Sequence, residues 1–137
     1  MDIRHLTDTH AVAPQILPED MATLAADGFT TVICNRPDEE NPPELQSPAM
    51  REAAEAAGLS YHYLPVTRPT ITADVAAEQA SIIASAEGKA LAYCASGTRC
   101  SMIWSIGKAG EMSADEILDR TSRAGYDLSP MRPLFGG

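Results

Sequence analysis

The stretch "TADVAAEQASIIASAEGKALAYC" (residues 72–94) decides the fold, because it predicts a helix followed directly by a strand. Thr72 has the side chain of a helix N-cap, and Gly88 marks the end of the helical pattern. The apolar run that follows predicts a strand ending at Cys94.

The same order of helix and strand occurs twice earlier in the chain. "LPEDMATLAADGFTTVIC" (residues 17–34) predicts a helix and then a strand that ends at Cys34. "SPAMREAAEAAGLSYHYLPV" (residues 47–66) predicts a helix capped by Ser47 and a strand running to about Val66. Helices and strands that alternate with short connections are typical of a parallel sheet covered by helices.

Other segments extend this pattern at both ends. A helix should begin just after Cys94 and run to about Lys108, and "SADEILDR" (residues 113–120) predicts another. Residues 3–13 predict a short edge hairpin. We therefore expect an α/β fold with a central, mainly parallel sheet of four to five strands flanked by helices.

Two segments carry no regular pattern. "NRPDEENPPELQSP" (residues 35–48) holds four prolines and four acids, which predicts an extended surface loop. The tail from Asp127 is predicted to be irregular. A chain of 137 residues is long enough for one core, so we expect a single domain over residues 1–137.

The composition excludes several classes of function. A formal net charge of −9 argues against nucleic-acid and anionic-membrane partners, because no basic surplus is present to neutralise phosphates. The first ten residues show no secretory signal, and no apolar run is long enough to span a bilayer. Three cysteines without framework spacing predict a reduced, cytoplasmic protein.

Positive charge gathers at one predicted edge of the sheet. The three strands above end at the same edge, where ligands bind in open α/β sheets, and an arginine follows each strand within a few residues. The chain has only ten basic residues, so this concentration predicts a site for a small anion. The alternative is that loop arginines simply pack their aliphatic stems. The three arginines are Arg36, Arg68 and Arg99.

The loop "CASGTR" (residues 94–99) links a strand to a helix through small residues. Its amides can form an anion-binding nest beside a helix N-terminus, which together with Arg99 would favour a thiolate at Cys94. Such a thiolate can attack phosphorus or sulfur. The alternative is a buried, inert Cys94 at a strand end. The nest would comprise Ala95, Ser96, Gly97 and Thr98.

The motif "YCASGTRCS" (residues 93–101) resembles "YCRSGTRS" of the beta-lactamase-hydrolase-like phosphatase domain family, a bacterial branch related to dual-specificity tyrosine phosphatases. Residues 14–40 are similar to that family's "GQI-PED-LA-AGF-TVINNRPD-E", and residues 53–66 to its "AAEAAGLSY-YIPV". The resemblance covers residues 10 to 128. It implies a phosphatase-like fold, with Cys94 as nucleophile and Arg99 as anion binder.

Spacing separates this loop from that of tyrosine phosphatases. Those enzymes have five residues between cysteine and arginine, whereas four residues, Ala95 to Thr98, lie between them here. The loop thus has the length found in rhodanese sulfurtransferases, and a tighter ring favours sulfur over a tetrahedral phosphate. Tyr93 also replaces the histidine that usually precedes the phosphatase cysteine.

Two substitutions within the family motif affect the thiolate. Ala95 replaces an arginine, and Cys100 replaces a serine whose hydroxyl would hydrogen-bond the sulfur. Cys100 is either a small buried residue or a resolving thiol. Cys34 would be able to pair with Cys94 under oxidation if their strands are neighbours.

No recognisable motif supplies a general acid. Asp38, Glu39 and Asp74 fall on loops near the expected edge, and sulfur transfer through a persulfide has less need of an acid than ester hydrolysis has. His62 lies in mid-strand and is interpreted as structural. No histidine and cysteine set has zinc spacing, so we expect neither metal nor cofactor.

Three hypotheses follow. The first is a rhodanese-type sulfurtransferase that carries sulfur as a Cys94 persulfide and takes thiosulfate or a persulfide as substrate. The alternative is a phosphatase that hydrolyses a phosphoester through a phosphocysteine. The third is an inactive anion-binding or redox-sensing module. Some members of the family carry a metallo-hydrolase domain, which makes a sulfur-metabolism hydrolase a candidate partner.

Overall fold

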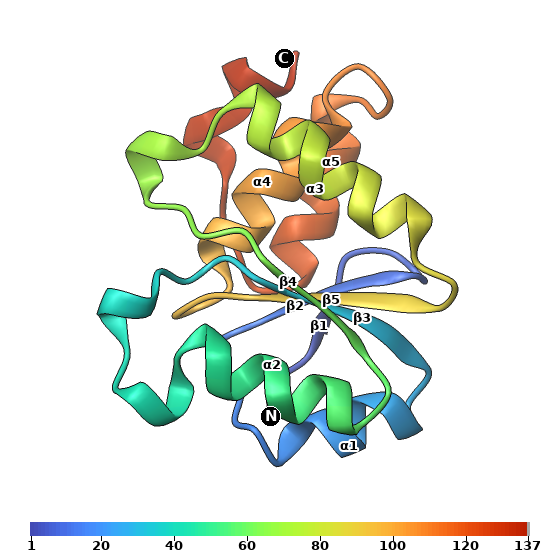
Figure 1. The fold of residues 1–137 in the computed structure, drawn as a ribbon. Helices are drawn as coiled ribbons and strands as arrows, with labels where there is room; N and C mark the ends of the chain where they lie inside the picture. The colour runs from blue at the N-terminus through green and yellow to red at the C-terminus, as the bar shows by residue number, and fades with distance from the viewer. Residues whose placement is uncertain (137) are drawn as a thin grey trace.

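The computed structural model describes residues 1–136 and consists of a central sheet with helices on both faces (Figure 1). The strand order is β1-β2-β5-β3-β4, with β1 antiparallel to β2 and the other neighbouring strands parallel. This confirms the mainly parallel sheet and the hairpin at its edge. The strands are β1 (Arg4–His5), β2 (His10–Ala13), β3 (Phe29–Cys34), β4 (Ser60–Tyr63) and β5 (Lys89–Tyr93).

The α-helices divide between the two faces of the sheet. The first two cover one face, and the other three cover the opposite face (Figure 1). Each parallel crossover thus places a helix on a face, as the alternating pattern predicted. The helices are α1 (Asp20–Ala26), α2 (Ser47–Ala56), α3 (Ala73–Ser85), α4 (Thr98–Lys108) and α5 (Ala114–Arg123).

Strand β5 supplies both cores, because successive side chains of a strand point to opposite faces. Leu91 and Tyr93 pack in the core beneath α1 and α2, whereas Ala92 packs in the core beneath α4 and α5. Cys34 lies opposite Tyr93 in the β3–β5 register and belongs to the first core, and Cys94 belongs to the second. The strands are neighbours, but Cys34 and Cys94 belong to cores on opposite faces of the sheet, which favours the core role of Cys34 over pairing with Cys94.

Several predicted element ends are shifted. Thr72 caps α3 as predicted, accepting a hydrogen bond from the Val75 amide at 3.2 Å. Ser47 is the first residue of α2 rather than its N-cap, because its hydroxyl donates to the Asp38 carboxylate. Strand β4 ends at Tyr63, three residues before the predicted end.

The segment over residues 35–48 is more ordered than its composition suggested. It contains two 3-10 turns, η1 (Asp38–Glu40) and η2 (Pro43–Leu45). The Asp38 carboxylate accepts hydrogen bonds from the Ser47 amide and hydroxyl, both at 2.7 Å. The chain's tail is likewise a helical turn, η4 (Ser129–Phe135). Polar contacts thus order the 35–48 segment, although its sequence lacks hydrophobic periodicity.

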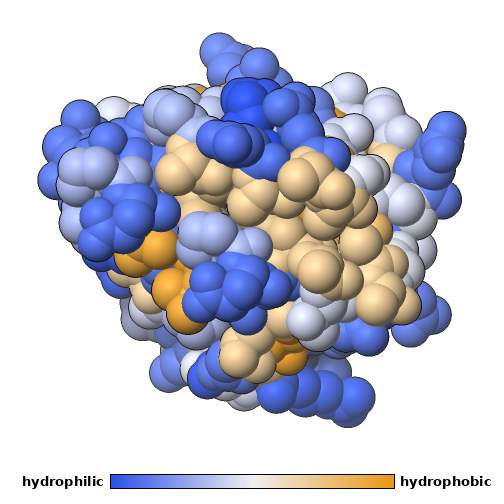
Figure 2. All heavy atoms as spheres, turned by 60° about the horizontal axis from the view of Figure 1, so that its bottom comes forward, coloured by the Kyte–Doolittle hydropathy of each residue, from blue (hydrophilic) through white to orange (hydrophobic). Residues whose placement is uncertain are grey.

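The outer face of α1 and α2 is rich in alanine. Figure 2 brings this side of the molecule forward and shows a broad, mildly apolar area. Ala22, Ala26 and Ala56 are exposed on the two helices. Alanine has the highest helix propensity, so these residues stabilise two short helices without needing burial. Over residues 1–136, no helix combines the length and apolar character that a bilayer crossing requires.

A buried pair of amides joins α3 to the sheet. Asn35 follows β3, and its Nδ2 donates to Gln79 Oε1 at 2.7 Å, while Gln79 Nε2 donates to Asn35 Oδ1 at 3.1 Å. Asn35 Nδ2 also donates to the Leu64 carbonyl at 2.9 Å. Both side chains are fully buried. The pair therefore fixes the positions of β3, α3 and the segment after β4 relative to one another.

Gln79→Leu should lower the free energy of unfolding by about 2 kcal/mol, because it keeps the volume but leaves the buried Asn35 oxygen without a donor. Urea denaturation measures this loss. Glu78→Leu, at an exposed position of the same helix, is the matched control and should change stability by about 0.5 kcal/mol or less. Equal stability of the two variants would contradict a structural role for the amide pair.

Candidate active site

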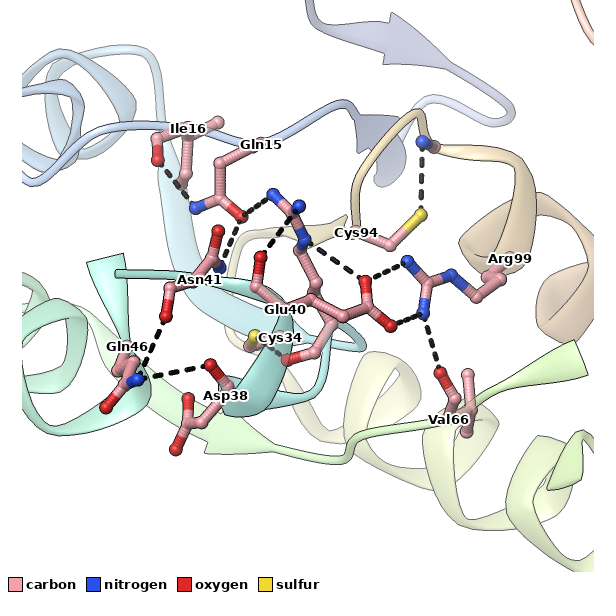
Figure 3. A network of polar contacts seen from close by, with 12 residues as sticks. Gln15, Ile16, Cys34, Asp38, Glu40, Asn41, Gln46, Val66, Cys94 and Arg99 are labelled. Atoms are coloured by element: carbon pink, nitrogen blue, oxygen red, sulfur yellow. Dashed lines mark hydrogen bonds and ion pairs between the residues drawn. The ribbon is translucent and has the colours of Figure 1, made fainter. Parts of the chain in front are cut away.

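The loop between β5 and α4 folds around the Cys94 sulfur. Gly97 has a φ of 93° and turns the backbone so that its amide donates to Cys94 Sγ at 3.1 Å (Figure 3). Glycine is favoured there because residues with a Cβ rarely adopt a positive φ. A Cβ at this position would also overlap the Tyr126 hydroxyl.

Three hydrogen bonds from outside the loop hold its carbonyl groups. The Tyr126 hydroxyl donates to the Ser96 carbonyl at 2.9 Å, and the Ser101 hydroxyl donates to the Gly97 carbonyl at 2.9 Å. The amide of Gln15, just after β2, donates to the Ala95 carbonyl at 3.3 Å. These donors fix the path of the loop backbone, whose Gly97 amide points to the Cys94 sulfur.

These surroundings lower the pKa of Cys94 to about 5. The largest contribution is a hydrogen bond from the Cys100 thiol, which outweighs the opposing effect of burial, and the amides of Cys100, Gly97 and Ser96 add to it. Cys94 is therefore a thiolate at neutral pH. Burial raises the pKa of Cys100 and of Cys34, so both remain thiols.

Arg99 presents a two-pronged donor edge. Its Nη1 donates to Glu40 Oε2 and to the Val66 carbonyl, both at 2.9 Å, and its Nη2 donates to Glu40 Oε1 at 2.8 Å (Figure 3). These bonds use three of the five guanidinium N–H groups. The Nε–H and the second Nη2–H carry no partner among residues 1–136, and together they match the geometry of an oxyanion.

Glu40 joins two arginines at this edge. Besides Arg99, it accepts a hydrogen bond from Arg36 Nε at 3.2 Å, and Arg36 Nη1 donates to Gln15 Oε1 at 3.2 Å. The hydrogen bond from Arg99 lowers the pKa of Glu40, and Arg36 lowers it further. Glu40 is therefore ionised at neutral pH and holds the two guanidinium groups rather than supplying a proton.

The sequence matches the family described as "Beta-lactamase hydrolase-like protein, phosphatase-like domain" over residues 2–111. The chain belongs to this family. A Beta-lactamase hydrolase-like protein of Agrobacterium fabrum is 38% identical over 120 residues, which cover 85% of this chain and 28% of the relative. The chain thus spans less than a third of that relative's length.

Solved structures share the fold of this phosphatase-like domain. A candidate phosphatase of Neisseria meningitidis is 36% identical, with a TM-score of 0.85 over 98% of this chain and 96% of the other. Tk-PTP in its active form has a TM-score of 0.73 at 16% identity, over 98% and 92% of the chains, which shows likeness of fold alone. The predicted phosphatase-like fold is confirmed. These matches favour the phosphatase alternative, and none supports the sulfurtransferase that the loop length favoured.

The phosphatase-like domain brings together only some of the predicted accessory residues. Arg36 and Arg99 meet at Glu40, as the shared sheet edge predicted. Arg68 lies exposed in η3 (Arg68–Thr70), and Asp74 is exposed in the first turn of α3. Neither side chain has a hydrogen bond or ion pair with residues 1–136, so the structure does not tie them to the loop.

The acidic residues near the loop do not include an evident proton donor. Both oxygens of Asp38 accept from Ser47 at the start of α2, which makes Asp38 a helix-capping residue. Glu39 is exposed, and within residues 1–136 its side chain makes no hydrogen bond with the loop. Over the same residues, no three His, Cys, Asp or Glu side chains gather closely enough to hold a metal ion.

Sequence reasoning missed the residues that support the site. Glu40 directly follows the predicted acid candidates Asp38 and Glu39. Its pairing with Arg99 spans 59 positions, so no local sequence pattern indicates it. Gln15 and Tyr126 likewise reach the loop from distant segments. Their only signal was position, since Gln15 follows the predicted hairpin and Tyr126 precedes the tail.

Gly97→Ala should destabilise the fold by about 3 kcal/mol, because it combines backbone strain with displacement of Tyr126. Gly58→Ala is the matched control, since Gly58 has a φ of 84° and nothing lies within 4 Å of an added Cβ. That variant should lose about 1 kcal/mol. Thermal or urea unfolding measures both, and equal losses would contradict the role of the Tyr126 contact.

Alkylation of Cys94 by iodoacetamide should accelerate as the pH rises through about 5 and then level off, because only the thiolate reacts. Cys100→Ala removes the main hydrogen-bond donor and should raise this midpoint by about one unit or more. Mass spectrometry of quenched samples measures the rates.

Cys94→Ser is the control for this reaction and should abolish rapid labelling, because burial raises the pKa of the other two cysteines and keeps them as thiols. Cys100→Ser keeps a donor and should keep a low midpoint. A midpoint near that of a free cysteine in the unaltered protein would contradict the assigned thiolate.

Proposed function

We propose that this chain hydrolyses aryl phosphomonoesters through a covalent phosphocysteine at Cys94. The observation that carries the proposal is the pairing of a low-pKa sulfur with a free Nε–Nη2 edge on Arg99, five residues later in the same loop. The family match and the fold of the solved relatives support it further.

The first step forms a sulfur–phosphorus bond. The Cys94 thiolate gives its electron pair to phosphorus, the bond from phosphorus to the aryl oxygen breaks, and the phenolate leaves with that pair. The loop amides and the free edge of Arg99 bind the remaining phosphoryl oxygens, where negative charge is concentrated. Water then attacks phosphorus and releases a proton to solvent, so that the sulfur–phosphorus bond breaks to give phosphate and the thiolate.

Within residues 1–136, no neutral carboxylic acid lies beside the loop to protonate the leaving group. The substrate is therefore restricted to esters whose alcohol leaves readily as an anion. Glu40 is held ionised by Arg99, and Asp38 is occupied at α2. An alkoxide leaving group needs a proton at the moment of bond breaking, whereas a phenolate needs it far less. The rate should therefore fall steeply as the pKa of the leaving alcohol rises.

Access to the sulfur requires movement. The Cys94 side chain is 0% exposed, so a phosphate can reach it only when neighbouring segments part. The segment that contributes Glu40 is held against Arg99 by a two-point ion pair between side chains that are 14% and 33% exposed, and a phosphate would compete with this carboxylate for the guanidinium group. We infer that this segment shifts when substrate binds.

Sulfur transfer is the second candidate, and the four-residue spacing between Cys94 and Arg99 is the observation that favours it. In that reaction the Cys94 thiolate attacks the outer sulfur of thiosulfate, sulfite leaves with the electron pair, and a persulfide remains. A thiol or cyanide acceptor then removes the sulfur and regenerates the thiolate.

The two chemistries separate in one experiment on the purified chain. We expect turnover of 4-nitrophenyl phosphate, abolished by Cys94→Ser and lowered about a hundredfold or more by Arg99→Lys, which lacks the two-pronged edge. Arg132→Lys, at an exposed site away from the loop, is the matched control and should retain full activity.

The same preparation is incubated with thiosulfate, and the mass of the intact protein is measured by mass spectrometry. Gain of one sulfur atom that Cys94→Ser prevents, without phosphate ester turnover, would overturn the phosphatase proposal in favour of sulfur transfer. Neither activity, despite rapid alkylation of Cys94, would overturn both.

A further inference from the structure

Two cysteine sulfurs lie next to each other at the junction of β5 and α4. Cys94 directly follows β5, and Cys100 lies in the first turn of α4. Both residues are 0% exposed and belong to the same core cluster. The Cys100 thiol donates its hydrogen bond to the Cys94 sulfur. A reactive sulfur and a second thiol in contact with it are the two partners from which a disulfide forms.

The third cysteine of the chain is placed apart from this pair. Cys34 packs in the core beneath α1 and α2, on the other face of the sheet, and its thiol donates to the Arg36 carbonyl at 3.3 Å. Burial raises the pKa of Cys34, so it remains a thiol. The tertiary structure therefore selects Cys100 as the partner of Cys94.

The residue after Arg99 distinguishes this chain from the family motif "YCRSGTRS", which has a serine there. A serine hydroxyl also donates a hydrogen bond, and it is a stronger donor than a thiol. Cys100 thus gives a weaker hydrogen bond at an equally buried place. What its thiol adds is the ability to form a covalent bond with an oxidised sulfur.

We propose that Cys94 is a site of oxidation by hydroperoxides and that Cys100 is its resolving thiol, so that a reversible Cys94–Cys100 disulfide protects the nucleophile and switches the site off. The assignment rests on the reactivity of the Cys94 sulfur and holds whichever substrate the loop takes. Hydrogen peroxide is smaller than an aryl phosphate, so it needs a smaller opening to reach this buried sulfur.

The reaction has two steps. The Cys94 thiolate gives an electron pair to one oxygen of the hydroperoxide, a sulfur–oxygen bond forms, and the oxygen–oxygen bond breaks. The hydroxide or alkoxide that leaves takes a proton from solvent, and Cys94 becomes a sulfenic acid. The Cys100 sulfur then attacks the Cys94 sulfur, its proton passes to the departing hydroxyl group, and water leaves. A dithiol reverses the oxidation by exchange.

The first step also activates the resolving thiol. Burial, the hydrogen bond to Cys94 and the negative charge on Cys94 raise the pKa of Cys100, whereas Arg99 lowers it. A neutral sulfenic acid at Cys94 removes that charge, while Arg99 remains in place. The pKa of Cys100 therefore falls when this thiol is needed as a nucleophile. Since Cys100 already lies beside the sulfur, it attacks before a second peroxide enters.

The test is peptide mapping of the purified chain after treatment with hydrogen peroxide. Trypsin cleaves after Lys89, Arg99 and Lys108, so Cys94 and Cys100 fall on adjoining peptides, residues 90–99 and 100–108. Under denaturing conditions, N-ethylmaleimide should label all three cysteines before oxidation and only Cys34 afterwards. The two peptides should then appear as one disulfide-linked pair that dithiothreitol separates.

Cys100→Ser restores the hydroxyl group of the family motif and removes the resolving thiol. Peroxide should convert its Cys94 to sulfinic and sulfonic acids, which dithiothreitol does not reduce. After oxidation and reduction, iodoacetamide should label Cys94 of the unaltered protein as before, and about tenfold less Cys94 in Cys100→Ser. Cys34→Ser is the matched control and should recover like the unaltered protein.

Several results would overturn the proposal: an unreactive Cys94, a linked pair that contains Cys34, or equal recovery of Cys100→Ser. Two labelled cysteines after oxidation, without added oxygen, would assign the lost thiol to a bond with a backbone nitrogen and overturn it as well. Because oxidation and recovery are measured by mass and alkylation, failure here is distinguishable from failure of the proposed hydrolysis.

Discussion

The thiolate of Cys94 is a negative charge enclosed by protein, and the loop can hold it only if donors surround the sulfur. The left-handed turn at Gly97 directs an amide toward the sulfur, and the Cys100 thiol supplies the strongest donor. The family motif has a serine at this position, and Cys100 takes its place here. Burial raises the pKa of the Cys100 thiol, so it remains protonated and can donate. Tyr126 and Ser101 hold the loop in this conformation through hydrogen bonds to the Ser96 and Gly97 carbonyls.

The second constraint is the balance of charge in front of the loop. Arg99 and Arg36 would repel each other without Glu40, whose carboxylate bonds to both. That pairing uses one edge of Arg99 and leaves the other for an anion. It also explains why the proline-rich segment is ordered, since its 3-10 turns bring Glu40 to the guanidinium groups and Asp38 to the start of α2.

A buried polar connection runs from α3 through the segments after β3 and β4 to Arg99. Gln79 of α3 bonds to Asn35, which follows β3. The Asn35 carbonyl accepts from the Val66 amide at 3.0 Å, and the Val66 carbonyl accepts from Arg99. Because these groups are buried, each must keep its partner, which gives the crossover segments a single arrangement around the strands.

Sequence alone determined the alternation of helices and strands and the loop with Cys94, Gly97 and Arg99, because periodicity, glycine breaks and spacing are local properties. It did not determine the pairing of Glu40 with Arg99, the opposite facing of Cys34 and Cys94, or the contact between Asn35 and Gln79. Those depend on strand order and on the paths of the crossovers, which bring together residues tens of positions apart. Only the tertiary structure decides such contacts, because burial and side-chain direction are fixed when the layers pack.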